Sequence, residues 1–264
     1  MIDAHCHLNF HSFEKDCDEV INNAFKAGVT KIINVGTKID SSEKAIELAQ
    51  RYNNLYATVG IHPHHADKLE ENWLEKLENL AKKPKVVAIG EVGLDYFSYK
   101  SNDIVSLKLQ KEIFAKQIEL ACKLKLPLQI HNRQAGKDII DILLDHKSYL
   151  LNPPGVFHCF AGSREFLKSA LNMGFYIGFD GNITYNGLAP GEDTDLKELV
   201  RYTPIDRIIL ETDSPFLTPI PKRGSRNVPE YVIITAEFVA KLKDTTFKEI
   251  EAKTTGNAIK LFKL

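Results

Sequence analysis

The chain has 264 residues, of which 44% are hydrophobic and 26% are charged, and its formal net charge is −1. It contains no apolar run long enough to span a bilayer and no basic-then-apolar signal at the N terminus, so we expect a cytoplasmic protein that does not bind a membrane. The near-neutral charge argues against a strongly basic surface that would hold nucleic acid regardless of sequence. A polyanion would have to be bound locally, by a metal ion or a short basic loop.

The cysteines, Cys6, Cys17, Cys122 and Cys159, form no CxxC pair. Their scarcity fits a reducing compartment, so we expect free thiols rather than disulfides. Chains of about 250 residues often form one α/β barrel. No repeat, low-complexity segment or linker interrupts the sequence, and we therefore expect one domain over 1–264.

Short β-rich segments alternate with longer stretches of helical periodicity. Apolar strands between amphipathic helices indicate a parallel sheet covered by helices, and eight such units close a (β/α)₈ TIM barrel. An open doubly wound sheet is the alternative, which the strand count disfavours. The first strand follows Met1-Ile2, and the others are predicted at 31–35, 55–59, 86–89, 127–130, 155–157, 175–179 and 207–210.

The stretch 106–125 is typical of an outer helix of such a barrel. Leu109, Ile113, Gln117 and Leu120 recur at helical spacing and predict one mostly apolar face. Proline directly after this stretch would end the helix. Extra C-terminal helices are expected at 228–243 and 246–263.

The first strand carries a pair of histidines, His5 and His7. Because they are two residues apart, both imidazoles point to the same side of an extended backbone. Neutral imidazoles that converge on one volume suit a divalent ion such as Zn, Mn or Fe. The carboxyl end of a barrel strand is where catalytic groups lie, so the pair favours a metal site, although it could also be a chance pair.

Residues able to bind a metal or exchange a proton follow most of the other predicted strands too. Groups needed only for packing or solubility would be scattered over both ends of the strands, whereas these gather where barrel enzymes have their active site. Histidines and carboxylates at one barrel mouth match a two-metal hydrolytic site, in which one carboxylate bridges the ions and a shared water becomes hydroxide near neutral pH. The second and seventh strands are the exceptions, and the set is His5, His7, His62, Glu91, His131, His158 and Asp213.

Several of these residues have other possible roles. His131 could be a core histidine and Glu91 could form a salt bridge, but the glycines around Glu91 allow close backbone approach and favour a site. Of the histidines after the third strand, we expect His62 to donate to substrate, with His64 a weaker candidate and His65 solvated.

Six motifs occur in order: Asp3-Ala4-His5-Cys6-His7, Gly60-Ile61-His62-Pro63-His64, Gly90-Glu91-Val92-Gly93-Leu94-Asp95-Tyr96, Ile130-His131-Asn132-Arg133-Gln134-Ala135, Phe157-His158-Cys159-Phe160-Ala161-Gly162 and Leu210-Glu211-Thr212-Asp213-Ser214-Pro215. Together they resemble the motifs of the TatD-type metal-dependent deoxyribonucleases over almost the whole chain. The resemblance implies a TIM barrel of the amidohydrolase type and a divalent-metal phosphodiesterase that acts on DNA, often from the 3′ end. It also implies the metal ligands: His5, His7, Glu91, His131, His158 and Asp213, with Glu91 bridging.

Three residues depart from the family pattern. Asp180 stands where a small or hydroxylated residue is expected, Asn182 replaces an apolar residue, and Asn132 replaces a more usual serine. These departures leave the ligand set intact and affect the substrate contacts expected near the seventh strand.

The leading hypothesis is hydrolysis of DNA phosphodiesters by two divalent ions (Mg, Mn or Zn), with Glu91 and Asp213 as catalytic residues. Asp213 would orient or deprotonate the attacking water, while Glu211 and Asp95 would support neighbouring groups. We expect a monomer that takes single-stranded DNA or 3′ ends. The predicted substrate contacts are His62, His64, Arg133, Lys222 and Arg226, the last two in a basic loop over 222–227 that could instead be a solvated turn.

Two alternative functions remain open. The first is a small-substrate amidohydrolase, lactonase or deacylase, which would use the same metals to cleave a bond other than a phosphodiester. One barrel fold supports many chemistries, and the near-neutral net charge mildly favours this alternative. A non-catalytic, metal-stabilised scaffold is the other, and it explains poorly why so many ligands gather at a solvent-open barrel mouth.

Overall fold

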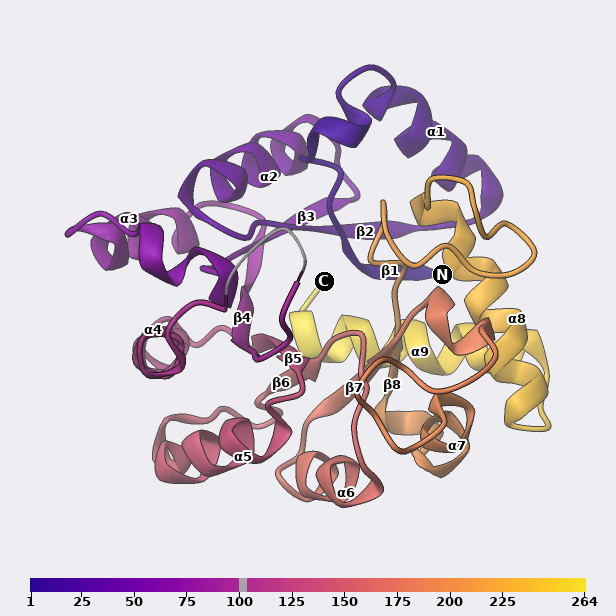
Figure 1. The fold of residues 1–264 in the computed structure, drawn as a ribbon. Coiled ribbons are helices and arrows are strands. Elements are labelled where there is room, and N and C mark those ends of the chain that lie inside the picture. Colours follow the sequence, from indigo (N-terminus) through magenta and orange to yellow (C-terminus); the bar gives the residue numbers. More distant parts are fainter. Residues whose placement is uncertain (100–103) are drawn as a thin grey trace.

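The structure is a computed structural model that describes residues 1–99 and 104–264. Within these residues, eight parallel strands are paired in sequence order, with helices outside them, which confirms the predicted (β/α)₈ barrel (Figure 1). The strands are β1 (Ile2–Cys6), β2 (Lys31–Val35), β3 (Leu55–Val59), β4 (Val86–Asp95), β5 (Leu128–Arg133), β6 (Gly155–Phe157), β7 (Tyr176–Phe179) and β8 (Ile208–Leu210).

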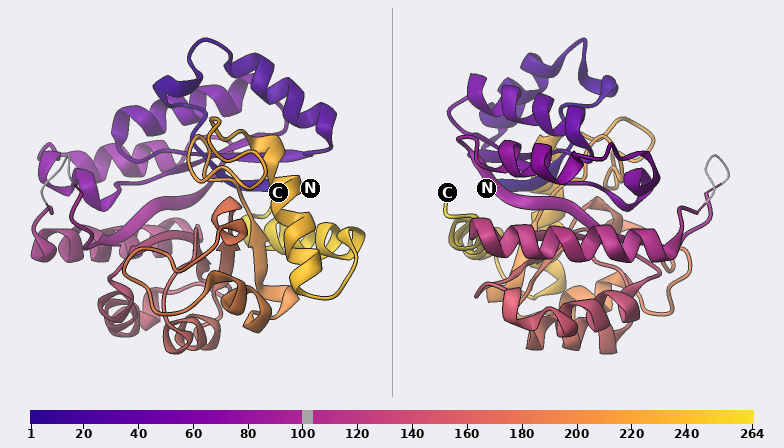
Figure 2. Two further views of the ribbon diagram at one scale, coloured as in Figure 1. Left: turned by 45° about the vertical axis from the view of Figure 1, so that its right-hand side comes forward. Right: turned by 90° about the vertical axis from the view of Figure 1, so that its left-hand side faces the viewer.

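Two further views show helices on the outside of the strands (Figure 2). In the described part of the chain, no helix is both long and apolar enough to cross a membrane. The α-helices are α1 (Cys17–Ala27), α2 (Ile39–Arg51), α3 (Trp73–Ala81), α4 (Leu107–Leu124), α5 (Gly136–Asp145), α6 (Arg164–Asn172), α7 (Leu196–Tyr202), α8 (Val232–Leu242) and α9 (Phe247–Phe262). Short 3₁₀ helices are η1 (His11–Phe13), η2 (Pro63–Lys68), η3 (Lys147–Tyr149), η4 (Gly181–Thr184), η5 (Ile205–Arg207) and η6 (Pro229–Tyr231).

The ring of strands closes where β1 meets the chain after β8. The backbone N–H of Asp213 donates to the His5 carbonyl at 2.9 Å. The buried Asp3 carboxyl accepts from the Thr212 hydroxyl at 2.7 Å and from the Thr212 N–H at 2.9 Å. Burial raises the pKa of Asp3 to about 8. This side chain therefore ties together two segments that both carry predicted metal ligands.

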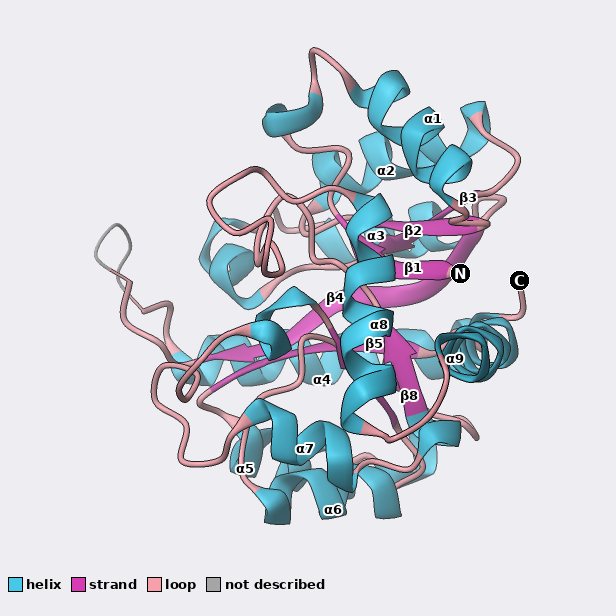
Figure 3. Ribbon diagram, turned by 90° about the vertical axis from the view of Figure 1, so that its right-hand side faces the viewer, coloured by secondary structure: helices cyan, strands magenta, loops and turns pink. Residues whose placement is uncertain are grey.

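Helix α9 covers the amino-terminal ends of the strands. Asn257 on α9 donates to the carbonyls of Ile205 and Ile208, at 3.0 and 2.8 Å, at the start of β8. Leu261 and Phe262 pack in one buried cluster with residues of the strands. Figure 3 shows α9 end-on beside the N terminus, with long loops at the opposite side of the barrel. The carboxyl ends of the strands are thus left open to loops.

Two buried glutamines of α4 hold the backbone near that open end. Gln117 accepts from the Ile61 N–H at 2.7 Å and donates to the Ile61 carbonyl at 3.1 Å. Gln110 makes the same pair of bonds to the backbone of Asp95, at 2.9 and 3.0 Å. The predicted apolar face of this helix therefore contains polar groups that fix the chain beside His62 and at the end of β4.

Three details differ from the predicted strands. β5 runs to Arg133 instead of ending at 130. β4 runs to Asp95 instead of ending at 89, because it pairs with β5 as far as Arg133 after a register shift, so Glu91 lies within the strand. Asp180 directly follows β7 and is fully buried, so the expectation that no acidic residue follows the seventh strand is wrong.

We expect Gln117→Leu to lower the free energy of unfolding by at least about 2 kcal/mol, because it leaves a buried N–H and a buried carbonyl of Ile61 without partners. Urea unfolding followed by circular dichroism measures this change. Glu119→Leu, on the exposed face of the same helix, is the control and should stay within about 0.5 kcal/mol of wild type. Equal stability of the two variants would show that Gln117 does not anchor the backbone at Ile61.

Candidate functional site

Six polar side chains converge at the carboxyl ends of the barrel strands. Because all strands of a parallel barrel end on the same side, residues far apart in sequence meet there. The side chains of His5, His158 and Glu91 are almost fully buried, whereas 14% of the Asp213 side chain is exposed. The structure brings together all six predicted ligands: His5, His7, Glu91, His131, His158 and Asp213.

One oxygen of Glu91 faces the histidine pair of β1. Glu91 Oε2 lies 3.7 Å from both His5 Nε2 and His7 Nε2, which are 3.2 Å from each other. Asp213 Oδ1 completes this group at 3.6 Å from His5 Nε2 and 3.3 Å from His7 Nε2. Four ligand atoms thus surround one small volume.

The other oxygen of Glu91 faces a second histidine pair. Glu91 Oε1 lies 3.0 Å from His131 Nδ1 and 2.8 Å from His158 Nε2. The two nitrogens are 3.3 Å apart. Ligands about 2.1 Å from a tetrahedral ion are about 3.4 Å from one another, so both groups have spacings that suit a divalent cation.

Hydrogen bonds to neighbouring groups orient two of the imidazoles. His7 Nδ1 lies 3.1 Å from the Val35 carbonyl, which can only accept, so this nitrogen carries a proton and Nε2 is the atom that faces the other ligands. His131 Nε2 is 3.1 Å from Asp95 Oδ2 and donates to it, which directs Nδ1 toward Glu91. Such partners fix the tautomer and ring orientation of metal-binding histidines.

The other two imidazoles each have one buried nitrogen with no partner among the described residues, His5 Nδ1 and His158 Nδ1. If Nε2 of each ring binds a cation, Nδ1 must carry a proton and needs an acceptor. The buried Glu211 lies 3.9 Å from His158 Nδ1, and one of its oxygens also has no partner in the described structure. These buried, unpartnered atoms fit rings that ligate cations and a carboxylate that orients them.

The electrostatics of the site also fit a cation. Although burial opposes it, nearby histidines, His158 first, hold the pKa of Glu91 well below its ordinary value. Burial and the neighbouring Asp213 raise the pKa of Asp180 to about 7, and burial raises that of Glu211 well above its ordinary value. Because these buried carboxyls lack sufficient positive charge to ionise normally, divalent cations would balance them.

His62 lies beside the second group of ligands, formed by Glu91 Oε1, His131 and His158, and is a neutral hydrogen-bond donor. Its Nδ1 accepts the His64 N–H at 3.2 Å, so Nε2 carries the proton and lies 3.5 Å from Glu91 Oε1. Burial holds its pKa well below the ordinary value. His64 lies further out, with Nε2 3.0 Å from Asp95 Oδ2. Asp95 thus contacts both His64 and His131, and the predicted supporting role of Asp95 stays a prediction.

Two of the basic residues predicted to bind substrate, Arg133 and Lys222, lie outside the cluster of ligands. Arg133, at the end of β5, lies 4.8 Å from the centroid of the Phe97 ring. Lys222 is exposed, 6.0 Å from the ring centroid of Tyr231. Neither belongs to the cluster of ligands, and their contacts with substrate remain predictions.

Arg226 is engaged elsewhere. Its guanidinium forms an ion pair with Asp16, bonds the Ser12 carbonyl and lies 4.5 Å from the Phe13 ring centroid. This arrangement anchors the loop 222–227 to the segment before α1. Since its hydrogen-bond donors face Asp16 and Ser12, we leave Arg226 out of the phosphate contacts proposed below.

Asp180 and the rings of Phe10 and Phe216 adjoin the site but were not predicted to be part of it. Burial raises the pKa of Glu211 and Asp180 raises it further, while both phenylalanine rings lie beside His7. The signal for Asp180 was present in the sequence, since it follows an apolar strand as His158 does. Nothing comparable marks the two phenylalanines.

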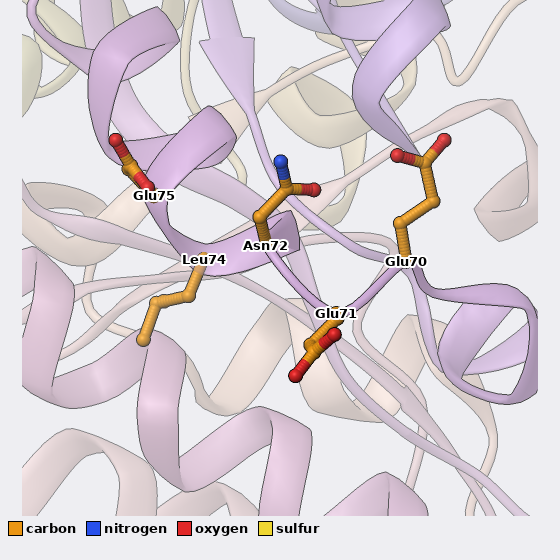
Figure 4. A pocket seen from close by; sticks show the side chains of 5 residues that line it. All are labelled: Glu70, Glu71, Asn72, Leu74 and Glu75. Atoms are coloured by element: carbon orange, nitrogen blue, oxygen red, sulfur yellow. The ribbon is translucent and has the colours of Figure 1, made fainter.

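A surface hollow of about 640 Å³ lies at the start of α3 (Figure 4). The side chains around it point in different directions rather than toward one centre, and most are carboxylates. It is lined by Glu70, Glu71, Asn72, Leu74 and Glu75, none of which belongs to the cluster of ligands.

We expect metal binding to release a proton. Although burial opposes it, Asp95 and Glu91 raise the pKa of His131 to about 9, so Nδ1 is protonated in the ion-free protein at pH 7.5. The proton must leave when an ion binds, so affinity should rise with pH up to about 9. The stability of the ion-free fold depends on pH in the opposite direction. Charged His131 stabilises this fold fully below its unfolded pKa of about 6.5, and the contribution is lost as the pH rises through the pKa of His131 in the folded protein.

Calorimetric titration with Mn²⁺ or Zn²⁺ in buffers of different ionisation enthalpy measures this release. The heat should change from buffer to buffer in wild type, and His146→Ala, remote from the ligands, should behave like wild type. A heat independent of the buffer would contradict a protonated His131.

Three comparisons place the chain among known proteins. The sequence model described as "TatD related DNase" matches residues 2–263. The uncharacterized metal-dependent hydrolase YabD of Bacillus subtilis is 41% identical over 265 residues, covering 100% of this chain and 99% of YabD. The protein of Salmonella typhimurium named 3′-5′ ssDNA/RNA exonuclease TatD is 34% identical, covering 100% of this chain and 99% of that protein.

A solved structure agrees with these sequence relatives. The crystal structure of YjjV, a TatD homologue from Escherichia coli, superposes with a TM-score of 0.89 at 30% identity, covering 100% of this chain and 98% of YjjV. The match of family model, relatives and fold extends over the whole chain, and the chain therefore belongs to the TatD family.

Proposed function

We propose that this protein is a metal-dependent hydrolase that cleaves phosphodiester bonds of DNA, removing nucleotides from the 3′ end with two divalent ions (Mg, Mn or Zn). One observation carries the proposal: the two oxygens of Glu91 face two separate histidine pairs. Membership of the TatD family supports it, as does the exonuclease name of the Salmonella relative.

His5, His7 and Asp213 would hold one ion, His131 and His158 the other, and Glu91 both. Ions held there would polarise the phosphoryl group and lower the pKa of the attacking water. His62, neutral and protonated at Nε2, would donate to a phosphate oxygen beside the second group. Arg133 and Lys222 remain candidates for contacts with flanking phosphates.

Asp213 would accept the proton of the attacking water. Its backbone has φ +53°, a left-handed conformation that costs a non-glycine residue about 1–3 kcal/mol and that the bond to the His5 carbonyl helps to hold. The carboxylate lies 3.3 Å from His7 Nε2 and is partly exposed, so both an ion and solvent can reach it.

The test is to strip the protein of metal and restore Mg, Mn or Zn singly while following single-stranded oligonucleotides labelled at either end. Loss of nucleotides from the 3′ end supports the proposal. A parallel panel of amides and lactones tests the small-substrate alternative. If chelation lowers the melting temperature but no metal restores any activity, a metal-stabilised scaffold is the better description.

We expect Asp213→Asn to lower kcat at least about 100-fold, the usual scale for removing a positioned general base, because the amide keeps the shape and one oxygen but cannot take the proton. Oligonucleotide affinity should change much less. Glu211→Gln is the matched control: this fully buried carboxyl lies behind the ligands, so its loss should cost less kcat. The test measures kcat, KM and bound metal for both variants. A kcat near that of wild type in Asp213→Asn would contradict the assignment of Asp213 as the general base.

A further inference from the structure

We propose that Phe10 and Phe216 form a stacking platform for one nucleobase of the substrate strand, beside the metal ligands. The proposal deepens the function proposed above and rests on it. It assigns a chemical class of ligand, a nucleobase, to a part of the site that the metal ligands do not explain.

The two rings lie next to each other and next to a predicted ligand, His7. The Phe10 ring is stacked on the His7 imidazole, with centroids 4.4 Å apart and planes at 17°. The Phe216 ring lies 6.3 Å from Phe10 at 72° and 6.4 Å from His7 at 65°. Phe216 is 51% exposed, so one of the largest apolar side chains at the mouth faces solvent.

Local backbone bonds attach each ring to a predicted ligand. The N–H of Phe10 donates to the His7 carbonyl at 3.0 Å, and that of Phe216 donates to the Asp213 carbonyl at 2.9 Å. Each ring therefore follows its ligand by three residues, in one turn. The rings are positioned by the same turns that carry the ligands, so they should keep their place relative to bound ions.

Buried hydrogen bonds hold the second turn. Asn227, which is fully buried, donates through Nδ2 to the carbonyls of Thr212 and Phe216, and its N–H donates to the Pro215 carbonyl at 3.1 Å. A half-exposed phenylalanine on a fixed turn gives up part of the hydrophobic stabilisation that burial would supply. Binding of a flat apolar ligand would recover it.

A nucleobase fits this surface better than an amide or lactone group. Every base has a π face, and stacking on protein aromatic rings is a sequence-tolerant way to bind single strands. A base unpaired from its complement is free to stack, so the platform predicts a preference for single-stranded ends. The protein needs no strong positive field for this contact, which agrees with its net charge of −1.

The experiment compares oligonucleotides that differ only in one base. Substrates carry either a normal nucleotide or an abasic tetrahydrofuran residue at the last or next-to-last 3′ position. Phe216→Ala should raise KM about 5- to 100-fold for the normal substrate, the scale of one lost base stack, with little change in kcat. Wild type and Phe216→Ala should be nearly equal when the platform base is missing, and Phe216→Trp should retain wild-type KM.

Leu188→Ala is the matched control, since Leu188 is 54% exposed and is not part of the platform. It should leave KM unchanged. If Phe216→Ala weakens normal and abasic substrates equally, the ring has a structural role only and the proposal is overturned. It is also overturned if the variant matches wild type on every substrate.

The proposed function can fail separately, if wild type cleaves no oligonucleotide with any metal. In that case fluorescence anisotropy of the same labelled oligonucleotides still measures binding to wild type and Phe216→Ala. A base-dependent loss of affinity supports the platform, and its absence overturns it.

Discussion

The burial of one carboxylate among imidazoles is the constraint on which the rest of the site depends. Glu91 contacts both histidine pairs and is nearly inaccessible to solvent. A buried charge is tolerated only when it is paired and hydrogen-bonded, because the interior cannot replace the lost hydration. In the ion-free protein, the protonated His131 beside Glu91 provides part of this pairing. A cation would replace the proton on His131 Nδ1, so the ligands can be held near their binding positions before an ion arrives.

The scaffold around the carboxylate limits how far each ligand can move. Asp3 joins β1 to the chain after β8, and the glutamines of α4 hold the backbone next to His62 and at Asp95. These bonds are made by side chains that no ion or substrate needs to touch. Displacing a ligand by about 1 Å can lower the catalytic rate substantially. The buried hydrogen bonds that hold the backbone behind the ligands therefore affect function, although their own role is structural.

The strand pattern and the motifs were enough to predict the barrel and the residues that meet at its mouth, because strand ends are read locally and a parallel barrel brings all of them together. The sequence could not show that Arg226 pairs with Asp16, 210 positions away, or that Asp3 bonds Thr212, 209 positions away. A basic residue in a loop after the last strand looks the same whether its partner is phosphate or protein. The length of β4 was also missed, since it depends on pairing with β5 beyond the apolar segment.

Two carboxyls that follow β8, Glu211 and Asp213, show how different surroundings give similar groups different roles. Glu211 has no exposed side-chain surface, accepts from the Cys159 N–H, and has its pKa raised by burial and by Asp180. Asp213, two residues later, is partly exposed and lies against His5 and His7. A group that must exchange a proton with water needs access to it, whereas a group that orients a ligand is more effective when it cannot move. The difference in burial therefore favours the proposed division of roles, with Asp213 for proton transfer and Glu211 for positioning.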